Sequence, residues 1–276
     1  MIKVIDVDKL FEKYISNYVY KNIGKVKPEE IENEIPNLYV KFGDQKLNEL
    51  DGKTPQEYYR SFSADQLIDC LKRHLEKGVE VSDFLCEALS VKENEDALVK
   101  AVSNDEDEEF TLYIMNMLSD IKSEKCLDRY LQFICWDYSE TIKELATEHL
   151  REYSDKVKEQ VLNCFYNSED KVKEYLTEIL AGCSQDDRVF NVLIEQFEKN
   201  QNNLPLYANY LAKYGDDRAL PLLMQTIEQE KLSYADFEEL RFAIEALGGE
   251  YNKVRDFSSD KSYKKIKCAK KSTPLS

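Results

Sequence analysis

The side chains best suited to proton transfer or metal binding are rare in this 276-residue sequence. It has two histidines, and neither belongs to a His-Glu-x-x-His zinc motif. His149 lies in an apolar helical stripe, which favours a partly buried structural role, whereas His74 stands between Arg73 and Leu75 in a charged helix and is expected at the surface. Neither a Gly-rich phosphate loop nor a nucleophile elbow is present. We therefore predict no catalytic site, no metal site and no cofactor, although a triad assembled from distant residues is left open.

The cysteines give no sign of a metal site or a disulfide framework. They are scattered singly, mostly at apolar helical positions, and no two have the spacing of zinc ligands. This pattern predicts small core side chains in a reducing compartment. The seven are Cys70, Cys86, Cys126, Cys135, Cys164, Cys183 and Cys268.

Carboxylates are abundant, which weakens the case for any one pair as a general acid and base. The densest run, residues 105–109, follows Asn104 and is typical of a capped helix start. It lacks the central glycine and the ligand spacing of an EF-hand loop, so weak calcium binding is only the alternative interpretation.

Charge is distributed unevenly along the chain. The 38 basic and 54 acidic residues give a net charge of −16, but residues 252–276 hold eight basic and two acidic residues. The remaining body, at about −22, repels phosphate backbones, so we do not expect nucleic acid as a main partner. We expect 252–276 to be a disordered basic tail that is either solvated, folded back on the acidic body, or in contact with nucleic acid or anionic lipid.

Composition favours a helical protein outside the membrane. Apolar residues make up 42% of the chain, while glycine and proline number only 8 and 6. No segment approaches the roughly 20 apolar residues of a membrane span, and the N-terminus lacks the apolar core of a signal peptide. We therefore expect an all-α, cytoplasmic protein.

Internal repetition organises the chain from about residue 80 to 250. Similar polar breaks start at Glu124, Asp155, Asp187 and Asp217, which are 31, 32 and 30 residues apart. Each break is an acid, a base and then a small, thiol or β-branched residue that opens an apolar stripe with helical spacing. The acid is expected to cap this second helix of each pair.

The first helix of each pair ends at a glycine in the later copies. Gly182, Gly215 and Gly248 are 33 residues apart and stand where a left-handed C-cap residue is expected. The predicted unit is therefore helix, turn, helix, and such units bury their apolar faces by stacking into a solenoid. The predicted pairs cover 106–136, 137–167, 169–200 and 203–231, with a weaker pair at 80–104 and a last helix at 233–248.

Residues 1–79 do not follow this period. They predict helices over 7–22 and 28–43 and a helical pair near 55–77, with Thr54 capping a helix that starts at Pro55. The predicted domains are therefore an N-terminal helical region (1–79), the helical repeats (80–251) and the basic tail (252–276).

One copy of the break carries a family resemblance. Asp216-Asp217-Arg218-Ala219-Leu220-Pro221-Leu222-Leu223 resembles the second-helix signature of short bacterial HEAT repeats, which also occur in phycobilin lyase subunits, and Asp186-Asp187-Arg188-Val189 is a looser copy. The resemblance covers about 80–250. It implies an α-α superhelix, here with an N-terminal helical cap region, whose usual role is to bind protein.

Three second helices carry an extra apolar pair beside the core stripe. Packing against neighbouring helices accounts for such pairs, but they also fit a groove on the concave side that holds a partner helix or peptide. Acidic neighbours would favour a basic partner. The candidate partner-binding residues are Leu162, Tyr166, Phe190, Ile194, Glu195, Leu220 and Met224.

The resulting hypothesis is a non-catalytic, protein-binding scaffold or adaptor. An alternative is an accessory or lyase-type subunit that holds a small molecule or modifies a partner, and it predicts a closed polar pocket around His149 or Trp136. A third, nucleic-acid binding, predicts a positive patch along the second helices.

Overall fold

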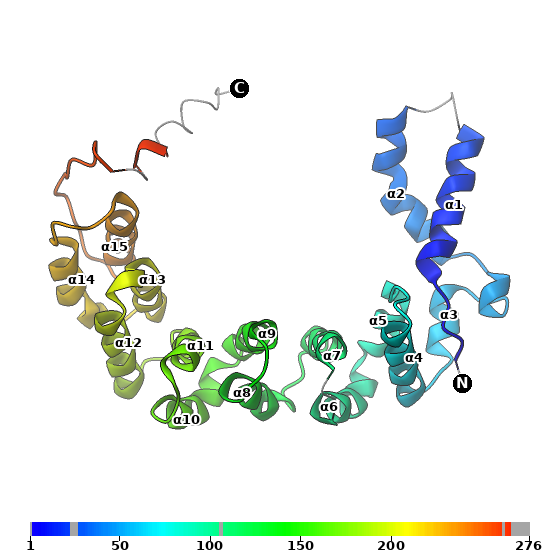
Figure 1. Ribbon diagram of the computed structural model, residues 1–276, viewed down its shortest axis with the longest axis horizontal. Helices are drawn as coiled ribbons and strands as arrows, with labels where there is room; N and C mark the ends of the chain where they lie inside the picture. The colour runs from blue at the N-terminus through cyan, green and yellow to red at the C-terminus, as the bar shows by residue number, and fades with distance from the viewer. Residues whose placement is uncertain (1, 23–26, 105–106, 261–262, 266–276) are drawn as a thin grey trace. The chain divides into compact units, whose positions relative to one another are not determined.

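The computed structural model describes residues 2–22, 27–104, 107–260 and 263–265, and over these ranges the chain is all-α (Figure 1). The predicted fold class of helices packed in neighbouring pairs is confirmed. Within the described ranges the only β interaction is an isolated bridge between Leu47 and Lys53. The chain forms two compact units, Met1–Arg129 and Tyr130–Ser276.

The first unit holds the N-terminal helices. The aromatic side chains of Phe11, Tyr39 and Phe42 pack α1 against α2, with the Phe11 ring centroid 4.9 Å from that of Tyr39 and 5.3 Å from that of Phe42. Thr54 and Glu57 form a capping box at the start of α3, which confirms the predicted helix start at Pro55. The helices are α1 (Val7–Asn22), α2 (Pro28–Gly43), α3 (Pro55–Arg60), α4 (Ala64–Glu76), α5 (Asp83–Leu89), α6 (Glu95–Asn104) and α7 (Glu108–Asp120).

The acidic run before α7 is a helix start, as expected. Asp107 accepts a hydrogen bond of 2.8 Å from the backbone N–H of Phe110 and thereby caps the helix. Residues 105 and 106 of the run lie outside the described residues. Over the described ranges no group of three or more His, Cys, Asp or Glu side chains is arranged to hold a metal ion.

His74 corrects an expectation. It is fully buried, and its Nδ1 lies 2.9 Å from the backbone oxygen of Glu80. The position has a simple cause: His74 is seven residues after Leu67 on the buried stripe of α4, so the helix turns it inward despite its charged neighbours. His149 is also buried, as expected, and its ring lies 5.3 Å from that of Tyr130.

Glu95 connects the start of α6 to the segment after α7. Its carboxylate is 8% exposed and lies 2.6 Å from Lys92 Nζ and 3.3 Å from Lys125 Nζ. The hydrogen bond from Lys92, supported by Lys125, lowers the pKa of Glu95 to about 2. These contacts stabilise only the ionised carboxylate.

We therefore expect an acid-dependent loss of stability at this site. Because the pKa of Glu95 is lower in the folded chain than its ordinary value of 4.5, the stabilisation is complete above about pH 4.5 and is lost as the pH falls toward 2. In urea unfolding measured from pH 7 to pH 2, Glu95→Gln should lower the midpoint at neutral pH. The difference from the wild type should shrink below pH 4.5, and a difference that stays constant would contradict this assignment.

The second unit consists of stacked helix pairs. Its first helices α9, α11, α13 and α15 form one layer and its second helices α10, α12 and α14 the other, with α9 packed on α11 and α13 packed on α15 (Figure 1). The bounds are α8 (Leu127–Cys135), which begins just before the unit, α9 (Glu140–Arg151), α10 (Ser154–Phe165), α11 (Asp170–Leu180), α12 (Asp187–Lys199), α13 (Leu204–Tyr214), α14 (Leu220–Ile227) and α15 (Tyr234–Ala246). These match the pairs predicted at 137–167, 169–200 and 203–231.

The layers correct the expected geometry of the second helices. Within this unit the first helices lie on the inner side of the bend and the second helices on its outer side (Figure 1). The sequence predicted a groove lined by second helices on the concave side, but in this unit the second helices lie on the convex side (Figure 1).

Two of the three repeat glycines act as predicted. Gly215 and Gly248 have φ of 77° and 82°, a conformation that side chains with a Cβ rarely adopt. Gly182 has a different role, because a Cβ there would stand 2.6 Å from Ser154 Oγ at the start of α10. Its small size thus permits close approach of two helices.

The start of the basic tail is packed on the second unit, which corrects the expectation of disorder there. Phe257 is 8% exposed, and its ring lies 5.1 Å from that of Phe237 in α15. Lys253 forms a 2.6 Å ion pair with Glu228, and Arg255 donates to the backbone oxygen of Ile227. Aromatic anchors and one acidic helix end thus hold this segment, in agreement with the alternative that the tail folds back on the acidic body. Residues 261–262 and 266–276, which include Cys268, lie outside the described residues.

The compact units do not coincide with the predicted domains, because the predicted boundary at residue 79 follows sequence periodicity whereas the units follow packing. No helix in the described ranges is long and apolar enough to cross a membrane.

Candidate interaction surface of the second unit

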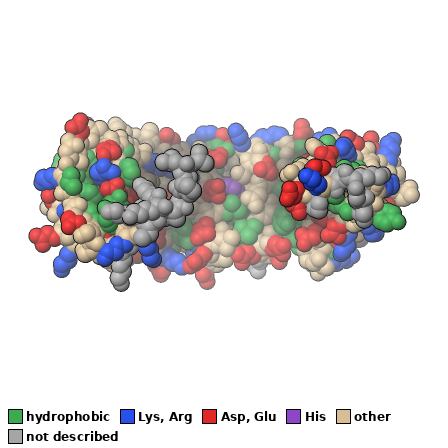
Figure 2. Space-filling model, turned by 90° about the horizontal axis from the view of Figure 1, so that it is seen from above, with side chains coloured by type: hydrophobic (Ala, Val, Ile, Leu, Met, Phe, Trp, Pro, Cys, Tyr) green, Lys and Arg blue, Asp and Glu red, His purple; other side chains and the backbone are tan. Residues whose placement is uncertain are grey.

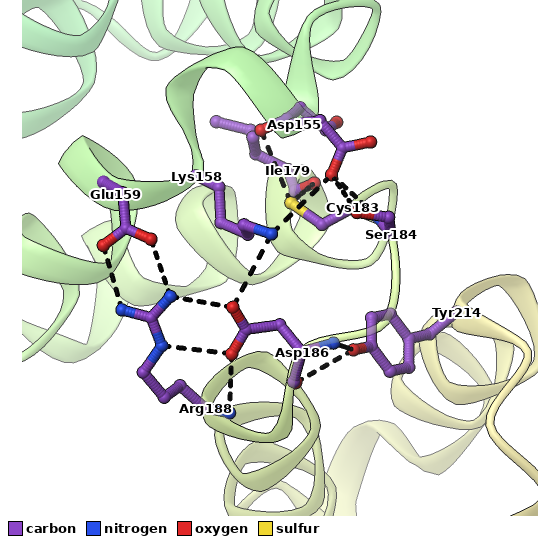
Figure 3. Close-up of polar contacts among 10 residues, drawn as sticks. Asp155, Lys158, Glu159, Ile179, Cys183, Ser184, Asp186, Arg188 and Tyr214 are labelled. Carbon is purple, nitrogen blue, oxygen red and sulfur yellow. Dashed lines mark hydrogen bonds and ion pairs between the residues drawn. The ribbon is translucent and has the colours of Figure 1, made fainter.

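Charged side chains at the starts of the second helices form a ladder between successive pairs (Figure 3). Arg188 donates hydrogen bonds of 2.6 and 2.9 Å to Glu159 of α10 and also contacts Asp186, which precedes its own helix. Lys158 lies 3.6 Å from the same Asp186 carboxylate. The hydrogen bonds from Arg188 hold the pKa of Asp186 well below its usual range.

The next pair repeats this arrangement. Arg218 donates to Asp216 at 2.6 Å and reaches back to Asp187 of α12 at 2.8 Å. Asp186 caps α12, and Asp216 caps the short 3-10 helix Asp217–Ala219 that leads into α14; each lies one residue before the acid that the sequence suggested. Because Asp187 does not cap its own helix, its carboxylate can accept the hydrogen bond from Arg218 of the next pair. All these groups bond to one another, so the ladder joins helix pairs and presents no set of groups aimed at a ligand.

The predicted partner-binding residues are only partly accessible. Leu162 is 5% exposed and belongs to the core, and Phe190, Ile194, Leu220 and Met224 are half-buried. The Arg218 guanidinium lies 4.3 Å from the centre of the Phe190 ring and covers it. Glu195 is exposed, and Tyr166 is 63% exposed. The fold thus brings the three second helices into one layer but leaves Tyr166 as the one large exposed apolar side chain of this set.

Trp136, which the sequence suggested only for the alternative pocket, is a second exposed aromatic side chain in this region. It directly follows α8, as Tyr166 directly follows α10, and it is 56% exposed. The two aromatic residues are 30 residues apart and occupy the same place in successive helix pairs. That spacing equals the repeat period, which is the signal that could have identified them together.

Two half-buried thiols, Cys135 and Cys164, lie at the ends of α8 and α10. The Ser168 hydroxyl donates to the backbone oxygen of Cys164 at 2.8 Å. Burial, reinforced by Cys164, raises the pKa of Cys135 to about 12, so this thiol stays protonated at neutral pH and is a poor nucleophile. In the described ranges all cysteines are free. Cys70, Cys126 and Cys183 are buried, as expected of core side chains, whereas Cys86, Cys135 and Cys164 are only half-buried.

An exposed carboxylate follows each of the two aromatic residues in the sequence. Asp137 comes directly after Trp136, and Glu169 comes three residues after Tyr166. Neither carboxylate forms an ion pair among the described residues. Two lysines of this region form ion pairs: Lys171 pairs with Glu140, and Lys199 lies 2.6 Å from Asp170. We name the four residues Trp136, Asp137, Tyr166 and Glu169 the aromatic edge. Two of the four carry carboxylates, while Lys143 acts on the neighbouring Cys135 and Lys173 lies over the Phe165 ring.

The inner face of the unit is also acidic. Glu144, Glu148 and Glu174 are exposed on α9 and α11, while Arg151 pairs with Glu178 at 2.5 Å. Figure 2 views the molecule from the side on which this layer lies, and acidic and hydrophobic side chains share that surface.

One cavity, of about 330 Å³, lies between α15 and the C-terminal segment. Its lining includes neither His149 nor Trp136. Its two guanidinium groups are engaged within the protein, since Arg255 donates to the backbone oxygen of Gln229 at 2.7 Å and Arg241 to Glu238 at 2.6 Å. The cavity thus lies where the C-terminal segment is fastened to α15.

No protein-family model matches this chain, and no curated protein or solved structure shows significant similarity to it.

Proposed function

We propose that this protein is a non-catalytic scaffold or adaptor, built from HEAT-like helix pairs, that binds another protein through the aromatic edge of its second unit. The observation that carries the proposal is the exposure of Trp136 and Tyr166 at the same place in two successive pairs. Large exposed aromatic residues are enriched at protein interfaces, where they supply much of the binding energy. The acidic chain and the absence of a membrane-spanning helix in its described part fit a cytoplasmic partner protein.

The ladder supports the same proposal. Ion pairs and hydrogen bonds connect α10 to α12, and α12 to the residues before α14, so α10, which precedes Tyr166, is held against its neighbour. A preorganised surface loses less conformational entropy on binding than a mobile one, so exposed side chains on it bind more strongly.

Co-purification with matched variants tests this proposal. The tagged chain, the double variant Trp136→Ala, Tyr166→Ala and the control Phe242→Ala would each capture proteins from the native cytosol. Phe242 is a suitable control because it is 53% exposed but lies on α15. We expect a captured protein that the double variant loses and the control retains, with circular dichroism showing that both variants are folded.

A further inference from the structure

The first two helices form a hairpin that buries few of its side chains. α1 has 16 residues but buries only Val7, whereas α7 has 13 residues and buries six. Among the other described side chains of α1 and α2, those that are buried are Leu38 and Phe42, near the end of α2. None of the described side chains of residues 14–22 and 29–37 is buried. These two ranges form the outer half of the hairpin, which points away from α3 (Figure 1).

Both helices nevertheless carry apolar stripes. That of α1 occupies five positions with helical spacing, and all five side chains are only half-buried although α2 packs beside them. The stripe of α2 includes Ile31 and Ile35, and Ile35 is 38% exposed. One neighbouring helix is therefore too few to cover either stripe, and a second hairpin completes such a core in a four-helix bundle. The five residues of the α1 stripe are Phe11, Tyr14, Ile15, Tyr18 and Val19.

Charge favours a second copy of this chain as the covering hairpin. Residues 7–43 hold six basic and six acidic residues, so this segment is neutral in a chain whose net charge is −16. The two helices differ in sign: α1 has three lysines and two acids, which gives +1, whereas α2 has one lysine and four glutamates, which gives −3. Three of these glutamates, Glu29, Glu30 and Glu32, form no ion pair among the described residues. A contact of α1 with α2 about a two-fold axis occurs twice, so it brings opposite charges together twice.

We infer that two copies of this protein associate through their α1–α2 hairpins and form a four-helix bundle about a two-fold axis. α1 of each copy then contacts α2 of the other, and the half-exposed side chains of both stripes, such as Ile15 and Ile35, form one shared core. The association uses no residue of the aromatic edge, so it is independent of the proposed function.

The molar mass in solution tests the association. Light scattering and sedimentation of the full-length chain, from micromolar to submillimolar concentration, should show a rise from the 32.3 kDa of one chain to twice that mass. Ile35→Glu should weaken dimerisation at least tenfold, because a two-fold contact buries the new charge twice. This variant should fold, since Ile35 already lies at the surface of a single chain.

Val40→Glu is the matched control. It adds the same charge to the same helix at a more exposed position, because Val40 is 67% exposed. Val40 lies two residues from both Leu38 and Phe42, so it does not share the face of the α2 stripe. We expect it to leave dimerisation unchanged.

Charge-reversed variants distinguish a second copy from any other occupant. The variant Glu29→Lys, Glu30→Lys, Glu32→Lys changes α2 from −3 to +3, and Lys13→Glu with Lys21→Glu changes α1 from +1 to −3. Each variant alone puts like charges on the two helices that meet, so each should remain monomeric where the wild type is half dimeric. Mixed in equal amounts they should dimerise, because each α1 then meets an α2 of opposite sign. Circular dichroism checks that both remain helical.

Three results would overturn the inference: a wild-type chain that stays monomeric to submillimolar concentration, equal weakening by Ile35→Glu and Val40→Glu, or charge variants that stay monomeric when mixed. If such a monomer still captures a protein through Trp136 and Tyr166, the proposed function stands and only the association of two copies is wrong.

Discussion

Phe197→Ala is expected to lower the free energy of unfolding by about 3–5 kcal/mol, the usual cost of removing a fully buried phenylalanine ring. Phe197 lies in α12 and is completely buried. That helix packs on both α11 and α13, so the cavity would weaken two interfaces between successive helices at once. In a stack of pairs, stability depends on such nearest-neighbour contacts.

Urea unfolding followed by far-UV circular dichroism measures this effect. The matched control is Phe242→Ala, which removes the same ring from a position that is 53% exposed and should cost less than about 1 kcal/mol. A loss below 1 kcal/mol for Phe197→Ala would show that its ring is not part of a packed core.

Asp216→Ala is expected to destabilise the chain by about 2 kcal/mol, at the upper end of the range for lost helix caps. The Asp216 carboxylate is 6% exposed and accepts hydrogen bonds from the backbone N–H, Nε and Nη2 of Arg218. Removing it leaves the 3-10 helix Asp217–Ala219, which leads into α14, without a cap. It also releases Arg218, which then holds Asp187 less firmly. Water can reach the half-exposed guanidinium, and this limits the loss.

The neighbouring residue provides the control for this prediction. Asp217→Ala removes the same group one position along, where the side chain is exposed, and should change stability by less than about 0.5 kcal/mol. Both variants would be compared by urea denaturation at pH 7. If the two variants lowered the free energy of unfolding equally, the cap and the ladder would not depend on Asp216.

Much of the fold followed from periodicity alone. Helical stripes predicted the pairs of the second unit within a few residues, because each stripe must be buried against a neighbour. The same rule places His74 in the core, because it lies on the stripe of Leu67. The sequence-based prediction instead gave more weight to its charged neighbours and placed it at the surface. Gly182 shows a second limit: sequence marks a glycine near a helix end but does not distinguish a left-handed turn from a close approach.

The candidate site was predicted less well, because exposure depends on which side of a helix its neighbours cover. Leu162 and Tyr166 are four residues apart on one helix face, yet Leu162 is in the core and Tyr166 lies beyond the helix end in solvent. Phe190 is covered by Arg218, a residue 28 positions away. Such contacts between pairs are visible only after the stack has formed.

The most direct test of the scaffold function is the amount of protein captured from the cytosol by the double variant Trp136→Ala, Tyr166→Ala relative to Phe242→Ala. We predict at least a tenfold reduction for one or more captured proteins, with both variants equally folded. Equal capture of every protein by the two variants would contradict a binding role for the aromatic edge.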